Sequence, residues 1–149
     1  MLKELVERKD LHSAVLVGVR SQRALFGKAA DADILGVVNW HMPAGSSPMG
    51  YSISVPRETD LQKAISKSGS FAVNFMGAKH GSLIDFHAGT DGSFSDLFSL
   101  LKVTKKECEK IDAPRVAEAE AVLECEVLQE MDSGDHTVFV GRVLHGESR

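Results

Sequence analysis

The chain has 149 residues, of which 43% are hydrophobic and 26% are charged, and its formal net charge is −4. We expect one domain spanning residues 1–149, because folding at this length buries roughly 70% of the surface that the unfolded chain exposes. The negative charge and the scattered lysines and arginines argue against nucleic acid as the main partner, which requires clustered basic residues.

Membrane insertion and secretion are not indicated by the sequence. No apolar run approaches the roughly 20 residues that span a bilayer, and residues 1–5 lack the apolar segment of a signal peptide. We therefore expect a cytoplasmic protein without a membrane partner. Two cysteines are too few for a disulfide scaffold, and Cys125 lies in an alternating segment where a small buried residue fits.

The first half of the chain predicts short strands. Residues 14–19 and 34–38 are β-branched apolar runs, and the second run leads into a polar stretch, residues 39–49, that we expect to be a loop. Residues 51–55 alternate apolar and small polar side chains, which is typical of a strand with one buried face. Pro56 should end that strand, because proline cannot donate to a strand ladder.

The clearest local signal is a capping box that starts a helix. The Thr59 hydroxyl and the Gln62 amide are spaced to satisfy each other's backbone N–H groups, and Gly69 can end the helix in a left-handed conformation. Residues 71–75 then read as a strand, and residues 96–102 as a short amphipathic helix. The charged run 105–110, which contains Cys108, reads as a solvated helix face or a loop.

The last part of the chain predicts a hairpin. Residues 121–127 and 137–144 both alternate apolar and polar side chains, and the turn residues 132–135 lie between them. Short strands separated by turns favour a small, mainly β barrel over a layered α/β fold, in which strands and helices would alternate.

The order of these elements resembles the flavin reductase-like, FMN-binding split-barrel family. The resemblance is carried by the segment 39–43 (NWHMP), by Arg57 and Thr59, and by the segment 71–74 (FAVN). It implies a split β-barrel of small antiparallel, Greek-key type that binds FMN. It also implies a homodimer in which each flavin pocket lies at the interface between two subunits.

A phosphate seat is indicated at the junction of the strand 51–55 and the helix. Arg57 precedes the helix whose N-cap is Thr59, and N–H groups at a helix N-terminus together with a guanidinium can hold a phosphate. Ser52 and Ser54 on the preceding strand can add hydroxyls. The alternative is an ordinary helix cap beside a free surface arginine, since Asp60 would repel a phosphate while it stabilises the bare helix.

The resemblance also implies contacts with the flavin ring. Asn39 would bond the ring edge or the ribityl hydroxyls, Trp40, His41 and Met42 would line the pocket, and Asn74 would lie beside the flavin. Trp40 as a core anchor and Asn74 as a satisfied buried amide are the structural alternatives.

Three further residues are weaker candidates. Lys79 and His80 could reach the phosphate or the ring, and His136 would lie near a nicotinamide or serve as a plain turn residue.

The resulting functional hypothesis is an FMN-binding flavin reductase, an NAD(P)H:flavin oxidoreductase that transfers hydride from NADH or NADPH to bound flavin without a side-chain acid or base. The alternatives are an FMN electron carrier without NAD(P)H activity and a flavin-free binding module. The sequence has no Rossmann or P-loop glycine motif and no Gly-x-Ser-x-Gly elbow. No metal site is expected, because the histidines lack metal-ligand spacing.

Overall fold

A computed structural model describes residues 13–25, 28–81, 84 and 96–149. In these ranges the strands are β1 (Val15–Leu25), β2 (Lys28–Val38), β3 (Trp40–Ser46), β4 (Met49–Pro56), β5 (Ser70–Phe75), β6 (Lys105–Glu107), β7 (Pro114–Val116), β8 (Ala121–Ser133) and β9 (His136–Ser148). The helical elements are α2 (Asp60–Ser68), the 3₁₀ helix η1 (Ala78–His80) and α4 (Leu97–Leu100). Within the described ranges, no helix is long and apolar enough to cross a bilayer.

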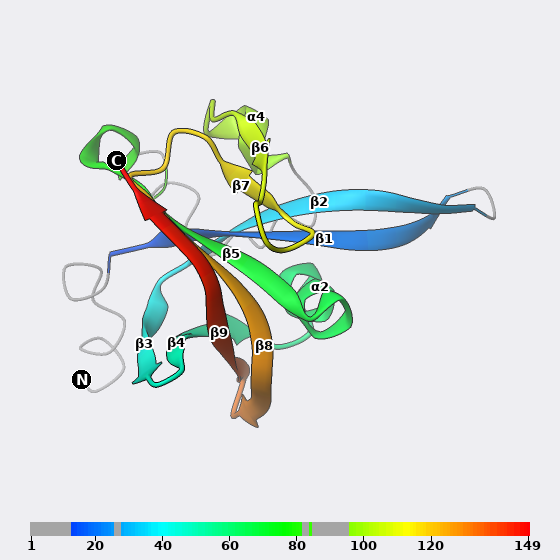
Figure 1. The fold of residues 1–149 in the computed structure, drawn as a ribbon. Helices are drawn as coiled ribbons and strands as arrows, with labels where there is room; N and C mark the ends of the chain where they lie inside the picture. Colours follow the sequence, from blue (N-terminus) through cyan, green and yellow to red (C-terminus); the bar gives the residue numbers. More distant parts are fainter. Residues whose placement is uncertain (1–12, 26–27, 82–83, 85–95) are drawn as a thin grey trace, which may run out of the picture.

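The main sheet is antiparallel and has the strand order β2-β1-β5-β8-β9-β4-β3. Its two edge strands, β2 and β3, are separated in sequence only by Asn39. The sheet must therefore curl until its edges meet at that residue. Figure 1 shows the resulting open barrel, from which the β1–β2 hairpin extends beyond the other strands. The expected mainly β split barrel is confirmed.

The barrel interior is filled by one face of the strands β1, β2, β4, β5, β8 and β9. On β4 the alternation is clear, because Tyr51, Ile53 and Val55 are between 0% and 9% exposed while the serines between them are half-buried. Phe71 and Phe139, both fully buried, come from β5 and β9 and join the same cluster. Burying each side chain of this size stabilises the fold by about 1.5–3 kcal/mol.

Helix α2 starts and ends as the sequence predicts. The Gln62 N–H donates to the Thr59 hydroxyl at 3.2 Å, and Gly69 ends the helix at φ 76°. The return half of the capping box is displaced by one residue, because the Gln62 side chain accepts from the N–H of Glu58 at 3.4 Å. Leu61, Ala64 and Ile65 are the helix residues that pack into the interior cluster.

A second apolar cluster covers the outer face of β1, β2 and β5. Leu16, Leu35 and Ala72 on these strands pack against the segment that contains α4, β6 and β7, including Leu97 and Phe98. In Figure 1 this segment, coloured from light green to gold, lies over one end of the sheet. One outer face of the barrel is thus closed by the chain itself.

Buried polar groups fasten this covering segment to the sheet. The Asn74 amide donates to the Leu16 carbonyl at 2.9 Å and accepts from the Val116 N–H at 2.9 Å, which joins β5 to β1 and β7. The carboxylate of Glu124 is fully buried and accepts from the N–H groups of Glu109 and Lys110 and from Arg115. These contacts use groups that would be costly to bury unpaired.

Two sequence interpretations change in the structure. The stretch 39–49 is not a loop, because residues 40–46 form β3 and pair with β4. The edge position of β3 tolerates Pro43, since the missing N–H is not needed there. The charged run 105–110 begins with strand β6 instead of a solvated helix or loop, and Cys108 is half-buried against the second cluster. The hairpin β8–β9 is confirmed, with longer strands and a turn at Gly134 and Asp135.

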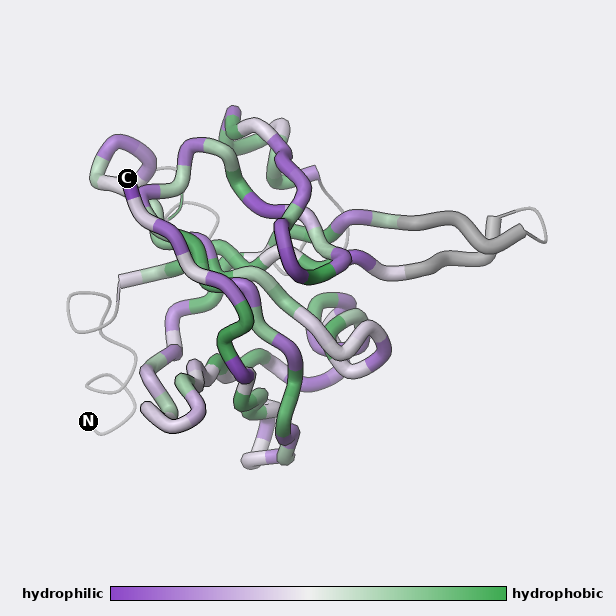
Figure 2. The backbone as a smooth tube through the Cα atoms, viewed as in Figure 1, coloured by the Kyte–Doolittle hydropathy of each residue, from purple (hydrophilic) through white to green (hydrophobic). Residues whose placement is uncertain are grey.

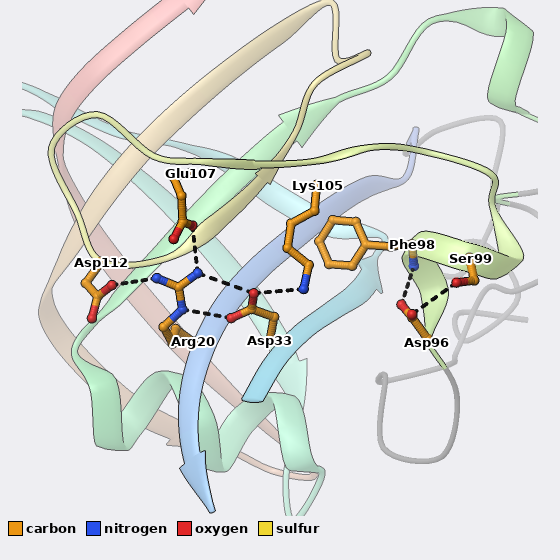
Figure 3. Close-up of polar contacts among 8 residues, drawn as sticks. All are labelled: Arg20, Asp33, Asp96, Phe98, Ser99, Lys105, Glu107 and Asp112. Atoms are coloured by element: carbon orange, nitrogen blue, oxygen red, sulfur yellow. Dashed lines mark hydrogen bonds and ion pairs between the residues drawn. The ribbon is translucent and has the colours of Figure 1, made fainter. Parts of the chain in front are cut away.

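An ion-pair network centred on Arg20 links the β1–β2 hairpin to the covering segment (Figure 3). The Arg20 guanidinium donates to Asp33, Glu107 and Asp112 at 2.6–2.8 Å, and Lys105 adds a 3.0 Å contact to Asp33. Burial acts to raise the pKa of Asp33, but the hydrogen bonds from Arg20 and Lys105 outweigh it and lower that pKa. Asp33 is therefore held as a charged group in the folded protein.

We expect Arg20→Met to lower the free energy of unfolding by about 1–3 kcal/mol at neutral pH, because charged hydrogen bonds are lost around a side chain that is 14% exposed. The depressed pKa of Asp33 gives the wild type stability that is present above its unfolded pKa of about 3.9 and is lost as pH falls through the folded value. The difference between the two proteins should therefore narrow below about pH 4.

Urea denaturation at neutral pH and at pH 3 measures this difference. Arg142→Met is the matched control, since Arg142 is an exposed arginine on β9. A loss that is the same at both pH values, or one that the control reproduces, would contradict the interpretation.

Candidate functional site

The outer face of β3, β4 and β9 carries the candidate site. Cross-strand pairing puts Trp40 beside Ser54, Ser54 beside Val138 and Val138 beside Met131. Ser54 alternates with the buried residues of β4, so this row lies on the face opposite the interior. The next row contains Met42 and Ser52. We call the surface made by Trp40, Met42, Ser52, Ser54, Met131 and Val138 the open face.

The open face and the bulge beside it carry exposed apolar side chains. Met42 is 62% exposed and Met131 is 53% exposed, and the bulge residue Leu128 on β8 is 54% exposed. Figure 2 shows hydrophobic stretches along the halves of β8 and β9 that approach their connecting turn. Exposed apolar patches of this kind mark binding surfaces more often than isolated exposed residues do.

An aromatic pair lies at one end of the open face. The rings of Trp40 and His136 have centroids 4.5 Å apart and planes tilted by 32°. The His136 Nδ1 is 2.8 Å from the Asp135 carboxylate, which holds the imidazole against the indole. The two rings therefore pack against each other at this end of the open face.

Four polar groups on or beside the open face differ in whether they are free to bond a ligand. The Ser52 hydroxyl donates to the Met42 carbonyl across the hairpin at 2.9 Å. Within the described part of the chain, the Ser54 hydroxyl, the Trp40 indole N–H and the Asn39 amide make no hydrogen bond. These half-buried groups can therefore bond a ligand without breaking a contact of the fold.

Arg57 lies at the same end of the sheet as the aromatic pair, because it follows Pro56, which pairs with His136. Its guanidinium donates to the Gly134 carbonyl at 3.2 Å and lies 3.4 Å from the Asp132 carboxylate. The Arg57 side chain remains 44% exposed. A partly exposed cation at this position can meet an anionic group that reaches the end of the open face.

Thr59 contributes less than the sequence suggests. Its hydroxyl donates to the Pro56 carbonyl at 2.8 Å and accepts from the Gln62 N–H at 3.2 Å. Both interactions belong to the cap of α2. In this structure the Thr59 hydroxyl is therefore used as an ordinary helix cap. In the preceding turn, Glu58 adopts φ 68°, a left-handed conformation that costs about 1–2 kcal/mol for a residue with a side chain.

His41 faces the interior instead of the open face, because its partner across the hairpin is the buried Ile53. Its Nε2 lies 2.6 Å from the Ser13 carbonyl and its Nδ1 lies 2.7 Å from the Tyr51 hydroxyl. A carbonyl can only accept, so Nε2 carries a proton. Burial raises the pKa of Tyr51, which keeps the phenol protonated beside the imidazole. His41 thus ties β3 to β4 and to the start of β1.

The other three candidates lie away from the open face. Asn74 is fully buried, and its amide bonds Leu16 on β1 and Val116 on β7. It is therefore a buried amide with its hydrogen bonds satisfied, as the alternative to a flavin contact predicts. Lys79 and His80 belong to η1, which follows β5 where β5 pairs with Ala121. That is the far end of β8 from Arg57, roughly 40 Å along the 13-residue strand. One bound phosphate cannot contact both places.

Sequence reasoning missed Met131, Val138 and Asp132. The predicted hairpin implied that Val138 and its neighbours alternate between faces, but the bulge between Val127 and Gln129 shifts the register by an amount that no local pattern reveals. Asp132 was assigned only to a turn, whereas it contacts Arg57.

The comparisons with known proteins agree with this fold. A family model described as flavin reductase like domain matches residues 13–149, and the chain belongs to this family. Flavoredoxin of Desulfovibrio vulgaris superposes with a TM-score of 0.77 at 20% identity, covering 93% of this chain and 70% of that one. An NADH:FAD oxidoreductase of Streptomyces globisporus gives a TM-score of 0.75 at 21% identity, covering 99% and 83%.

Among curated relatives, a ferric-chelate reductase (NAD(P)H) of Archaeoglobus fulgidus is 28% identical over 103 residues, which is 68% of this chain and 60% of that protein. The chain therefore spans about 60% of the length of this relative. A second protein of the same organism is 31% identical over 108 residues and is also spanned to 60% of its length.

Proposed function

We propose that the chain binds FMN on the open face and acts as an NAD(P)H:flavin oxidoreductase. The observation that carries this proposal is the arrangement at one end of the sheet: the packed rings of Trp40 and His136 and the unbonded hydroxyl of Ser54 lie on the open face, and the half-exposed guanidinium of Arg57 lies beside them at the hairpin end. Membership of the flavin reductase-like family supports a flavin as the ligand class.

The residues present fit such a ligand in three respects. Trp40, Met131 and Val138 offer an apolar wall, Ser54 and Asn39 can bond the hydroxyls or the ring edge, and Arg57 can pair with the phosphate. Bound FMN would supply the hydride acceptor. The protein groups would orient the flavin and neutralise its phosphate, so no side chain has to act as an acid or a base. His136 packs against Trp40 at the end of this wall, where a nicotinamide would approach.

Three similar proteins favour different donors for the electrons. The NADH:FAD oxidoreductase and the ferric-chelate reductase (NAD(P)H) support direct use of a nicotinamide. Flavoredoxin supports the second candidate, an FMN carrier that is reduced by another protein. The choice between them depends on one reaction, the transfer of hydride from NADH or NADPH to the flavin.

We further propose that a second copy of the chain covers the open face. The exposed methionines and Leu128 would leave an apolar surface in water, and a flavin ring on this face would keep one side uncovered. A homodimer in which the two open faces meet covers the apolar surface, and the partner then shields one edge of each flavin while one ring face stays open to a nicotinamide.

Tryptophan fluorescence should report binding directly. The chain contains one tryptophan, and Trp40 lies on the open face, so FMN bound there should quench its emission saturably by contact and energy transfer. The measurement is a titration with FMN, corrected by the same titration of free N-acetyltryptophanamide. A decrease that only matches this correction would place the flavin elsewhere or exclude binding.

Anaerobic reduction separates the two candidate activities. We expect the FMN-loaded protein to lose its yellow absorbance on addition of NADH or NADPH, faster than free FMN does under the same conditions. The measurement is stopped-flow absorbance under nitrogen. A protein that retains FMN but bleaches no faster than free FMN would be the carrier instead of the reductase.

The dimer has its own test. We expect light scattering to return twice the chain mass for the wild type, and a shift toward the monomer for Met131→Glu, because a carboxylate would be buried in the contact. Leu100→Glu is the matched control, since Leu100 is a leucine on α4 that is 42% exposed. A wild-type monomer, or equal behaviour of both variants, would contradict the proposed interface.

A further inference from the structure

Asp132 is held in one position by a buried hydroxyl. Its Oδ1 accepts from the Oγ1 of Thr137 at 2.9 Å, and Thr137 lies directly opposite Asp132 in the β8–β9 register and is 1% exposed. The other oxygen, Oδ2, is 3.4 Å from the Arg57 guanidinium. One hydrogen bond and one ion pair therefore position this carboxylate at the hairpin end.

Both the backbone and the side chain of Arg57 are hydrogen-bonded to the same hairpin end. Its N–H donates to the Asp135 carbonyl at 2.9 Å, and its guanidinium donates to the Gly134 carbonyl. The side chains of Arg57 and Asp132 nevertheless remain 44% and 60% exposed. An ion pair with this exposure is weak and exchanges readily with other charged groups.

From this geometry we propose that Asp132 is a specificity-determining residue for the flavin, acting as an internal counter-ion that a flavin phosphate must replace at Arg57. The proposal rests on the proposed function. FMN carries a phosphate and has to displace Asp132 or share Arg57 with it, whereas riboflavin carries none and leaves the pair intact. Asp132 therefore reduces the preference of the site for FMN over riboflavin.

Repulsion between the Asp132 carboxylate and the phosphate also lowers the affinity for FMN relative to riboflavin. Two negative groups that share one guanidinium repel each other, and the repulsion is strongest at low ionic strength. The size of the effect is that of an exposed ion pair, which corresponds to a change in affinity of about two- to fivefold.

The experiment compares the dissociation constants of FMN and riboflavin for the wild type and Asp132→Asn, measured by flavin fluorescence at low and high salt. Asparagine keeps an oxygen that accepts from Thr137 but carries no charge. We expect the variant to bind FMN about two- to fivefold more tightly, to bind riboflavin as the wild type does, and to lose its advantage at high salt. Thermal melting verifies that the variant is folded.

Glu130→Gln is the matched control. It removes the same charge from the same strand, while its side-chain oxygen can still accept from Ser66, and it should leave both affinities unchanged. An unchanged or reduced preference for FMN in Asp132→Asn would overturn the proposal, as would an equal gain in the control.

Arg57→Ala separates this proposal from the proposed function. If the wild type binds neither flavin, the proposed function fails. If Arg57→Ala weakens FMN more than riboflavin while Asp132→Asn changes nothing, the phosphate seat stands and the role of Asp132 is wrong. If Arg57→Ala weakens both flavins equally, the phosphate is held elsewhere and the role of Asp132 is wrong as well.

Discussion

The fold depends on the connection between the two edges of its main sheet. Strands β2 and β3 lie at opposite ends of the strand order, yet only Asn39 separates them in the chain. Because consecutive residues cannot be far apart, the sheet has to bend around until its edges meet. The interior cluster fills the space enclosed by this bend, and the seam at Asn39 fixes where β3 begins and thus which of its side chains face outward.

The two outer faces of the barrel differ in whether another described segment of the chain covers them. The face of β1, β2 and β5 is covered by an apolar segment that Asn74, Arg20 and Glu124 fasten with charged and neutral hydrogen bonds. No described segment covers the face of β3, β4 and β9, and methionine side chains are exposed there. The division between a covered face and the open face therefore follows from where residues 97–119 run.

The sequence predicts those parts of the fold that local patterns determine. Alternation on β4, the cap at Thr59 and the hairpin at Gly134 are each set by neighbours within a few residues. Strand β3 was missed because Pro43 and Gly45 resemble a loop, although an edge strand tolerates both. The burial of Glu124 depends on a bulge and on Arg115. Contacts between distant segments also limited the prediction of the site, since the side of β3 on which His41 lies depends on pairing with β4.

The cap of α2 has a consequence for the kinetics with which the proposed ligand would bind. The Thr59 hydroxyl and the Gln62 side chain satisfy groups at the helix start without any anion, so the helix is complete before a ligand arrives. Arrival then needs no ordering of this segment. We accordingly expect association at this end of the barrel to follow a single second-order phase, whose rate rises in proportion to ligand concentration without levelling off.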